Sequence, residues 1–311
     1  MMLHCLICIV LIGAINGEIT TECLETFNQW SLNFSKIYKS PEATMKAVED
    51  FIVNKELVEA HNLKYELHEV SFKVGLWEKS DHTVKEITDA LCGLKSKILR
   101  DILRRPIARS FDNEVVGRSL NVSVLPRTQD WSWALDTVRD QGYSCGSCWA
   151  FTAVAIIEAH YYIKHYDIIT LSEQYLVDCV PFGCGGGHYY SALKYVKEHG
   201  IVNSSYVYRD FQGICLNDPQ LARLEITGFA LFPSGDEEKL KTVVGNIGPV
   251  AVGIDASLDT FVNYQSGIYY DKRCNTTEIT HAVLIVGYGT ENGVDYWLIR
   301  NSWVSILNFF I

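Results

Sequence analysis

The feature that most constrains this chain is the stretch Gln141–Phe151, Gln-Gly-Tyr-Ser-Cys-Gly-Ser-Cys-Trp-Ala-Phe. It leads into a run, Trp149–Ile157, that is apolar on nearly every side of a helix wheel and is interrupted only by Thr152. A helix without a polar face has to be buried inside a sizeable domain. Cys148 would then stand at the first turn of that helix, where free backbone N–H groups and the helix dipole lower a thiol pKa and favour the nucleophilic thiolate.

Cys145 and Cys148 also form a Cys-x-x-Cys pair, which admits two further interpretations. A redox pair would follow a strand in a thioredoxin-like unit, and residues 131–142 do not have the pattern of a strand. Half of a zinc site would require a second close pair of Cys or His at the right distance along the chain, and no pair stands at that spacing from Cys145 and Cys148. We therefore expect neither a metal nor a cofactor, and we interpret Cys148 as a nucleophile rather than an inert buried cysteine.

Length and composition indicate a globular protein, and the N-terminal stretch indicates the secretory pathway. The 311 residues are 48% hydrophobic and 21% charged, and the net charge of −10 argues against nucleic acid as a partner. Residues 3–15 are almost all apolar and precede a small-residue cleavage sequence, which predicts a signal peptide over residues 1–17. This stretch is too short to span a bilayer, so we expect no membrane partner. Four sequons would permit glycosylation: Asn33, Asn121, Asn203 and Asn275.

Residues 18–118 have helical and polar patterns. Trp30, Phe34 and Tyr38 recur every four residues and predict one helix, which Pro41 breaks while opening the next. One face of that second helix is shared by Ala47, Phe51, Asn54, Val58 and Asn62. Taken alone, this pattern predicts a small helical bundle.

Residues 100–123 contain five arginines and few large apolar side chains, which predicts an exposed linker open to proteolysis. Cleavage near Leu120–Leu125 would release a second domain, residues 119–311. In the first part, Cys23 and Cys92 could pair with each other, which the sequence leaves open.

The second part changes from helical to strand patterns. Leu171–Cys179 predicts a helix capped by Ser172. The predicted strands are Ile226–Phe232, Pro249–Ile254, Gly267–Tyr270, His281–Tyr288 and Asp295–Trp303. Helices followed by strands imply an α+β fold, and ligands favour the cleft between two such halves.

A glycine run, Gly183–Gly187, precedes His188 and Tyr189. Such a run can cradle a phosphate when it opens a helix and a lysine follows, and no such lysine follows here. The alternative is a backbone that lies close to a bound peptide and hydrogen-bonds it like an added strand.

His281 and Asn301 belong to a predicted hairpin with its turn at Asn292-Gly293. If the hairpin pivots near Glu291, the two side chains lie almost opposite each other. An imidazole that moves a proton needs an acceptor to fix its ring and tautomer, and an asparagine can supply one.

These motifs together resemble the papain family of cysteine proteases. Cys145-Gly-Ser-Cys148-Trp149 is similar to the family's sequence around the nucleophile. His281-Ala-Val and Arg300-Asn-Ser-Trp303 also match the family's sequence motifs. His281 and Asn301 follow Cys148 by 133 and 153 residues. The resemblance implies a papain-like fold with a helical lobe and a β-barrel-like lobe.

The resemblance further implies a cysteine endopeptidase that is made as a zymogen, is lysosomal or extracellular, cleaves proteins or peptides through a thioester and is monomeric. Phe51-x-x-Asn54-x-x-x-Val58-x-x-x-Asn62 resembles the end of the inhibitory propeptide of cathepsin L-like proteases, although Ala43 and Ala47 replace the family's Glu and Arg. A second propeptide pattern keeps only Gly75 and Asp81, so residues 18–118 would be a divergent inhibitory propeptide.

The family's residue roles carry over to the matching positions. Cys148 would attack the peptide carbonyl, His281 would hold and return the proton, and Asn301 would orient His281. The Gln141 side chain and the Cys148 N–H would form the oxyanion hole. The substrate-binding residues would be Gly186, Gly187, His188, Tyr189, Gly253 and Trp303, and the implied disulfides are Cys145–Cys184 and Cys179–Cys215.

The family pattern stops after Trp303, because Val304–Ile311 lacks the family's glycine turn and closing strands. We therefore expect a C-terminally incomplete peptidase domain with an open, apolar edge and an unpaired Cys274. The alternative function is a catalytically inactive papain-like homologue that acts, if at all, as a binding or inhibitory protein.

Overall fold

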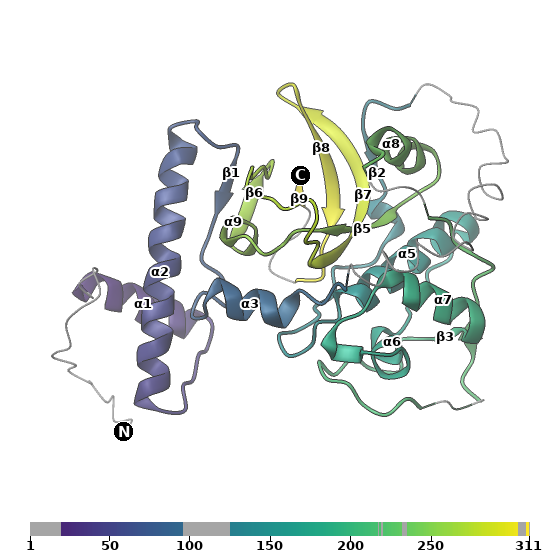
Figure 1. The fold of residues 1–311 in the computed structure, drawn as a ribbon, viewed down its shortest axis with the longest axis horizontal. Coiled ribbons are helices and arrows are strands. Elements are labelled where there is room, and N and C mark those ends of the chain that lie inside the picture. Colours follow the sequence, from purple (N-terminus) through teal and green to yellow (C-terminus); the bar gives the residue numbers. More distant parts are fainter. Residues whose placement is uncertain are drawn as a thin grey trace.

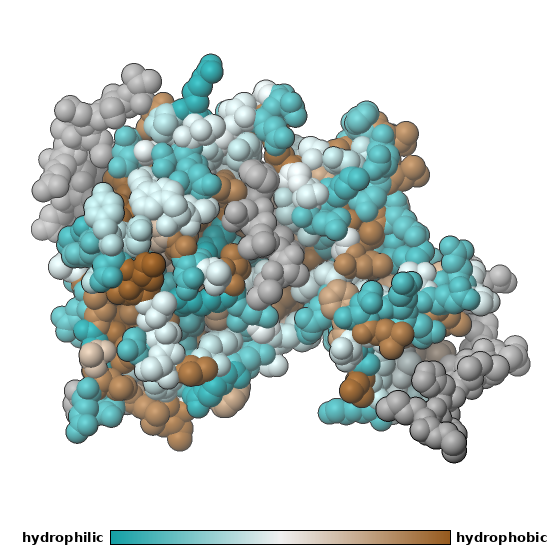
Figure 2. Space-filling view, turned by 180° about the vertical axis from the view of Figure 1, so that it is seen from behind, coloured by the Kyte–Doolittle hydropathy of each residue, from teal (hydrophilic) through white to brown (hydrophobic). Residues whose placement is uncertain are grey.

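The computed structural model describes residues 20–95, 125–216, 218, 220–231, 235–303 and 309–310. The predicted signal peptide, linker and cleavage site lie outside these residues. Figure 1 shows a slender helical body beside a larger body that contains the sheet. Seen from behind, a deep notch separates the two bodies on one side, and both carry a mixture of hydrophilic and hydrophobic side chains (Figure 2). In the described part of the chain no helix has the length and apolar character needed to cross a membrane.

The helical body contains α1 (Thr21–Asn33), α2 (Pro41–Glu66) and α3 (Val84–Leu91). Polar caps begin each helix: Thr20 accepts from the Cys23 amide, Ser40 from the Ala43 amide, and Thr83 forms a capping box with Glu86. Each cap satisfies a backbone donor that the first helical turn leaves free.

The predicted aromatic stripe is only partly helical. Helix α1 ends at Asn33, so Tyr38 lies beyond it, yet the Tyr38 ring still packs 6.0 Å from that of Phe27. The predicted face of α2 is confirmed, since Ala47, Phe51, Asn54 and Val58 are buried. Asn54 donates to the carbonyls of Ser80 and His82, which ties the following loop to α2.

A strand that the sequence did not reveal joins the two bodies. β1 (Phe72–Val74) pairs antiparallel with β6 (Tyr264–Gly267), with Phe72 opposite Gly267. Phe72 and Val74 are buried in one hydrophobic cluster with Tyr264 and with residues of the large sheet. The first part of the chain therefore completes a core of the second part.

The helical lobe of the larger body is built around α5 (Cys148–His165), whose first half is almost wholly buried, as its sequence predicts. The predicted capped helix is α6 (Glu173–Cys179), with Ser172 accepting from the Tyr175 amide. Disulfides join Cys145 to Cys184 and Cys179 to Cys215, the pairings that the family resemblance implied. The smaller elements here are η2 (Ser132–Ala134), η3 (Gly183–Gly185), α7 (Tyr189–His199), β3 (Ile201–Val202) and β4 (Arg223–Leu224).

The other lobe contains a sheet centred on β7 (His281–Glu291). One edge of β7 pairs with β5 (Val250–Ile254) and β2 (Gln129–Asp130), and the other pairs with β8 (Val294–Arg300). Figure 1 places α8 (Glu237–Asn246) beside this sheet and the short α9 (Asp259–Val262) beside β6. The larger body thus has a helical lobe and a sheet lobe, and the fold is α+β, as predicted.

Two strand predictions need correction, and the expected open edge is present only in part. Residues 226–231 form no strand, because Ile226 and Phe229 pack against the helical lobe and the segment pairs with no neighbouring strand in the described chain. The strand predicted at Gly267–Tyr270 lies earlier, at β6, where β1 supplies its partner. The outer edge of β8 is covered only in part, since β9 (Phe309–Phe310) pairs with Leu298 and Ile299.

Candidate active site

Cys148 is the first residue of α5 and is fully buried. The turn before it is fixed by the Cys145–Cys184 disulfide and by the Gly146 amide, which donates to the Cys184 carbonyl over 3.1 Å. Burial raises the pKa of the Cys148 thiol to about 11, although backbone hydrogen bonds from Ala282, Gly93 and Trp149 pull it down. In this closed state the thiol is neutral at pH 7.

His281 and Asn301 meet across the β7–β8 hairpin. The Asn292-Gly293 turn, with both φ values positive, brings the strands back with Glu291 opposite Val294. His281 Nε2 lies 2.7 Å from Asn301 Oδ1, so the predicted pairing is present. The Trp303 ring packs over the imidazole at 4.7 Å between centroids and leaves Asn301 only 4% exposed.

The second nitrogen of His281, Nδ1, has no hydrogen-bond partner among the described residues. Ala282, the next residue, packs against Cys148, and the Ala282 amide is one of the groups that lower the pKa of the Cys148 thiol. His281 is therefore adjacent along β7 to a residue that packs against the thiol, and its Nδ1 is unpartnered among the described residues. Burial lowers the pKa of His281 to about 4, against the effect of the Asn301 hydrogen bond, so the ring is also neutral at pH 7.

Gln141 is fully buried, and its amide orientation is fixed by its neighbours. The Ser302 hydroxyl donates to Oε1 over 2.6 Å, which leaves Nε2 to donate outward. Nε2 donates to the backbone carbonyl of Leu91 over 2.8 Å and to that of Cys145 over 3.3 Å. The Leu91 carbonyl thus lies at the position to which the Gln141 side-chain amide donates.

Residues 91–95, which follow α3, run through the site as an added strand. Gly93 O accepts from the Gly187 amide over 2.8 Å, and the Lys95 amide donates to Gly187 O over 2.7 Å. On the opposite side the Leu94 amide donates to Thr280 O over 2.9 Å. The glycine run thus hydrogen-bonds an extended segment in the way that its sequence predicted, and here that segment belongs to the chain itself.

The Leu94 side chain is buried against Tyr189, Ile279, Ala282 and Cys148. A Cβ on Gly253 would approach the Leu94 side chain to 2.7 Å, so the absence of a side chain there makes room for leucine. A Cβ on Gly186 would come within 2.5 Å of the Gly93 carbonyl.

His188, which was predicted to bind substrate, lies at the start of α7. Its ring is buried and accepts a hydrogen bond from the Tyr190 amide, so it caps α7, while Tyr189 makes the contact with Leu94. Trp303, also predicted as a substrate-binding residue, stacks against Trp77 of the first part of the chain, with centroids 6.5 Å apart.

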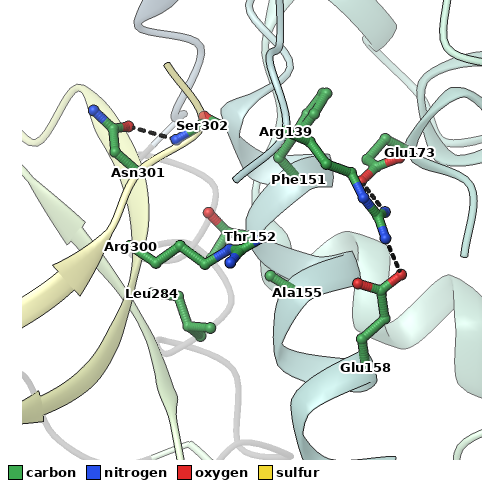
Figure 3. Close-up of a pocket in the computed structure, with 10 residues that line it drawn as sticks. All are labelled: Arg139, Phe151, Thr152, Ala155, Glu158, Glu173, Leu284, Arg300, Asn301 and Ser302. Atoms are coloured by element: carbon green, nitrogen blue, oxygen red, sulfur yellow. Dashed lines mark hydrogen bonds and ion pairs between the residues drawn. The ribbon is translucent and has the colours of Figure 1, made fainter. Parts of the chain in front are cut away.

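A buried ion cluster beside Asn301 was not foreseen. Figure 3 shows the Arg139 guanidinium between Glu158, on α5, and Glu173, on α6, at 2.8 and 2.6 Å. Arg300, the neighbour of Asn301, lines the same pocket. Its guanidinium donates to the backbone carbonyls of Asp136 and Thr137. Residues so far apart in sequence gave no local pattern that could have predicted this cluster. Among the described residues no group of His, Cys, Asp and Glu could hold a metal ion.

Comparison with known families finds two matches. Residues 125–306 match the family described as papain family cysteine protease, and residues 27–87 match the cathepsin propeptide inhibitor domain. The first match contains Cys148, His281 and Asn301, and the second contains α2 and the loop that leads to α3.

The chain is also similar to whole proteins. Digestive cysteine proteinase 1 of Homarus americanus is 34% identical over 289 residues, which is 90% of this chain and 85% of that protein. Cathepsin L of Sarcophaga peregrina is 34% identical over 288 residues, 90% of this chain and 84% of that protein. The solved structure of digestive procathepsin L2 proteinase from Tenebrio molitor larval midgut superposes with a TM-score of 0.80 at 34% identity, covering 90% of each chain.

Proposed function

Because the chain belongs to the papain family of cysteine proteases and is cathepsin L-like over most of its length, we propose that it is an endopeptidase zymogen whose nucleophile is Cys148. The observation that carries the proposal is the His281 Nε2–Asn301 Oδ1 contact of 2.7 Å, which leaves Nδ1 without a partner among the described residues. An imidazole held in this way can move a proton at one nitrogen while the other stays fixed.

In the acylation step the Cys148 thiolate attacks the carbonyl carbon of the scissile peptide bond. The proton taken from the thiol is held on His281 and passes to the leaving amine, so that the bond to nitrogen breaks and a thioester remains. Water then attacks the thioester, His281 accepts its proton, and the acid product leaves as the thiol is restored.

Gln141 stabilises the charge that develops on the carbonyl oxygen. Its Nε2 already holds a backbone carbonyl, that of Leu91, at 2.8 Å, which supports the assignment as an oxyanion-hole donor. For a Gln141→Ala variant we expect a fall in kcat of about 10²–10³, the usual cost of one such donor.

Residues 20–95 act as an intramolecular inhibitor. Residues 91–95 take the hydrogen bonds that a substrate backbone would take, and they exclude water from the catalytic pair. The buried thiol, with a pKa of about 11, and the buried imidazole, with a pKa of about 4, cannot form an ion pair at neutral pH. Removal of the segment would hydrate both groups and allow the thiolate–imidazolium pair to form.

We further propose that the protein enters the secretory pathway, acts in the lysosome or outside the cell as a monomer on protein or peptide substrates, and is divided into residues 1–17, 18–118 and 119–311 as the sequence predicts. The alternative of an inactive homologue gains no support from the comparisons, because the similar proteins are named as proteinases and cathepsins.

The test uses acid-activated protein, a fluorogenic peptide and a thiol-directed epoxide. Wild type should cleave the peptide and carry the label on Cys148, and Cys148→Ser should fold, bind no label and lose cleavage. Cys274→Ser is the matched control, because Cys274 is a free but exposed cysteine. Cleavage that survives in Cys148→Ser would refute the assignment, and folded wild type with neither label nor turnover would favour the inactive homologue.

A further inference from the structure

The turn between Gln141 and Cys148 is held near both ends by one side chain from a distant loop, that of Tyr208. The Tyr208 hydroxyl donates to the backbone carbonyl of Gln141 over 2.7 Å. Its oxygen also lies 2.7 Å from the hydroxyl of Ser147, the residue before Cys148. A tyrosine hydroxyl has one proton, and because that proton goes to Gln141, the Ser147 hydroxyl is the donor in the second hydrogen bond. These two hydrogen bonds, the Tyr208 bridge, join the two ends of the turn through a single oxygen.

The Ser147 hydroxyl does not cap its own helix. Ser147 is the N-cap residue of α5, yet its side chain accepts no hydrogen bond from the first turn of that helix. A serine at this position usually accepts from such an amide, as Ser172 does at the start of α6. The hydroxyl of Ser147 is thus used for the contact between the turn and Tyr208.

The Tyr208 side chain is itself fixed in place. Its ring packs edge-to-face against Phe151, on α5, with the ring centroids 4.8 Å apart. Burial raises the pKa of the Tyr208 hydroxyl, against the effect of the hydrogen bond from Ser147. The hydroxyl therefore stays protonated at acidic and neutral pH and remains a donor to Gln141.

The same loop also holds the middle of the turn. The Asp210 carboxylate accepts from the Tyr143 amide over 3.0 Å and from the Ser144 amide over 3.0 and 3.1 Å. A Cβ on Gly142 would come within 2.4 Å of that carboxylate, so the loop lies closely against the turn. The path of the turn thus depends on residues 208–210, which are more than 60 positions away in the sequence.

The two ends of this turn carry the two donors assigned to the oxyanion hole, the Gln141 side chain and the Cys148 N–H. Two donors stabilise one oxyanion only when their spacing fits it before the reaction begins. Ser302 fixes other parts of Gln141, since its carbonyl accepts from the Gln141 amide over 2.9 Å and its hydroxyl donates to Oε1 over 2.6 Å. The Gln141 carbonyl is the remaining backbone group, and the Tyr208 bridge ties it to the residue before Cys148.

We propose that Tyr208 is a positioning residue of the oxyanion hole, and that its bridge sets the spacing between the Gln141 side chain and the Cys148 N–H. It acts through the two ends of the turn and takes no part in the proton transfers. The Cys145–Cys184 disulfide still anchors the turn without the bridge, so loss of the bridge should change the spacing and not unfold the lobe. The inference rests on the proposed function, because it assigns a role in that reaction.

The experiment compares wild type with Tyr208→Phe, which removes only the hydroxyl, after acid activation. The kcat is expressed per Cys148 labelled by the thiol-directed epoxide, so that a change in the folded fraction does not enter it. We expect kcat to fall about tenfold, the size that the loss of one or two ordinary hydrogen bonds gives, and KM to stay unchanged. Tyr206→Phe is the matched control, because the Tyr206 hydroxyl donates to Asp178 over 2.7 Å and not to the turn. Its kcat should equal that of wild type.

A double-mutant cycle distinguishes positioning from a general loosening of the lobe. In Gln141→Ala one donor is gone, so no spacing between donors is left to set. Tyr208→Phe should therefore lower kcat about tenfold in the wild-type background and hardly at all in the Gln141→Ala background. An equal fall in both backgrounds would overturn the inference, as would an unchanged kcat in Tyr208→Phe alone.

Ser147→Ala breaks the same bridge from its other end and takes the place of Tyr208→Phe in the cycle if that variant folds poorly. Its effect on kcat should show the same dependence on Gln141.

A second measurement needs no turnover. In a Cys148→Ser zymogen, addition of Tyr208→Phe should speed hydrogen exchange at the amides of residues 143–148, and addition of Tyr206→Phe should not. Unchanged exchange at these amides would also refute the role of Tyr208. Folded wild type without peptidase activity would count against the proposed function, while the exchange rates would still decide whether Tyr208 holds the turn.

Discussion

The propeptide and the peptidase body are stabilised by different means. In the propeptide, an aromatic cluster around Phe51 forms the local core, and many of its ion pairs are exposed. Such exposed pairs contribute little to stability. The peptidase body has two disulfides, and its helical lobe has a larger buried core around Trp149. We therefore expect the propeptide to have a lower free energy of unfolding than the peptidase body.

The two bodies also differ in how a buried carboxylate responds to acid. Burial raises the pKa of Asp81 in the propeptide, but hydrogen bonds from His82, Lys36 and Tyr38 outweigh it and bring the pKa down to about 2. In the peptidase body burial dominates and raises the pKa of Glu158 to about 7, against the pull of Arg139.

These opposite shifts give opposite pH effects. A carboxyl with a lowered pKa contributes stability that is present above its unfolded value, near pH 4, and is lost as the pH falls toward 2. A carboxyl with a raised pKa favours the folded state more as the pH falls from about 7 toward its unfolded value of about 4.5. Acid therefore weakens the inhibitor through Asp81 and strengthens the enzyme body through Glu158, which suits a zymogen activated by acid.

The largest effect should come from Phe51→Ala, which removes the centre of the propeptide core. Phe51 is fully buried against Phe27 and Trp30, so we expect a loss of about 3–5 kcal/mol. In a Cys148→Ser background, hydrogen exchange should rise throughout α1 and α2 and stay unchanged in α5–α7. Val53→Ala, on the exposed side of the same helix, is the control and should change little. Equal loosening of α5 would show that the two bodies unfold together.

Next is the double variant Cys179→Ala/Cys215→Ala, which opens a 36-residue loop in the helical lobe. Loop entropy predicts a loss of about 4 kcal/mol from the peptidase body. Chemical denaturation should move the peptidase transition to lower denaturant and leave the propeptide transition in place. Cys274→Ser, which breaks no disulfide, is the control. An unmoved peptidase transition would contradict the contrast between the bodies.

Glu158→Gln tests the acid response of the peptidase body. Linkage predicts that lowering the pH from 7 to about 4.5 stabilises the wild-type body by up to about 3 kcal/mol, and that the variant lacks this slope. The readout is the slope of unfolding free energy against pH, because removal of the charge also unpairs Arg139. Glu198→Gln, an exposed residue of α7, should keep the wild-type slope. A wild-type body that instead loses stability as the pH falls from 7 to about 4.5 would contradict the raised pKa of Glu158.

The smallest effect is that of Asp81→Asn. The lowered pKa of Asp81, about 2, corresponds to about 2 kcal/mol of propeptide stability that wild type loses as the pH falls from 4 to 2. The variant should already lack it at pH 6, so that limited proteolysis releases its propeptide at a higher pH than in wild type. Asp89→Asn, an exposed α3 residue, is the control. Identical release curves for Asp81→Asn and wild type would rule out this carboxylate as the source of the acid response.

Local patterns predicted much of the fold and of the site. The apolar run of α5, the face of α2, the Ser172 cap and the Asn292-Gly293 turn depend on neighbouring residues and were visible in order along the chain. The His281–Asn301 pair was predictable because a hairpin turn fixes which residues face each other.

Other features depend on partners far away in the sequence. A three-residue strand such as β1 is marginal by itself and exists because β6 offers an edge and a hydrophobic cluster to it. Residues 226–231 have a strand pattern and find no such edge.

By itself, the sequence determined which residues could do chemistry: a cysteine at the start of a buried helix, a histidine and an asparagine on facing strands, and a glycine run suited to hold a peptide backbone. Only the tertiary structure decided what fills that site now. Residues 91–95 lie across it, which places the Leu91 carbonyl on Gln141 and the Leu94 side chain against Cys148. Burial by that segment, a contact between bodies distant in sequence, removes water from Cys148 and His281 and keeps both groups neutral.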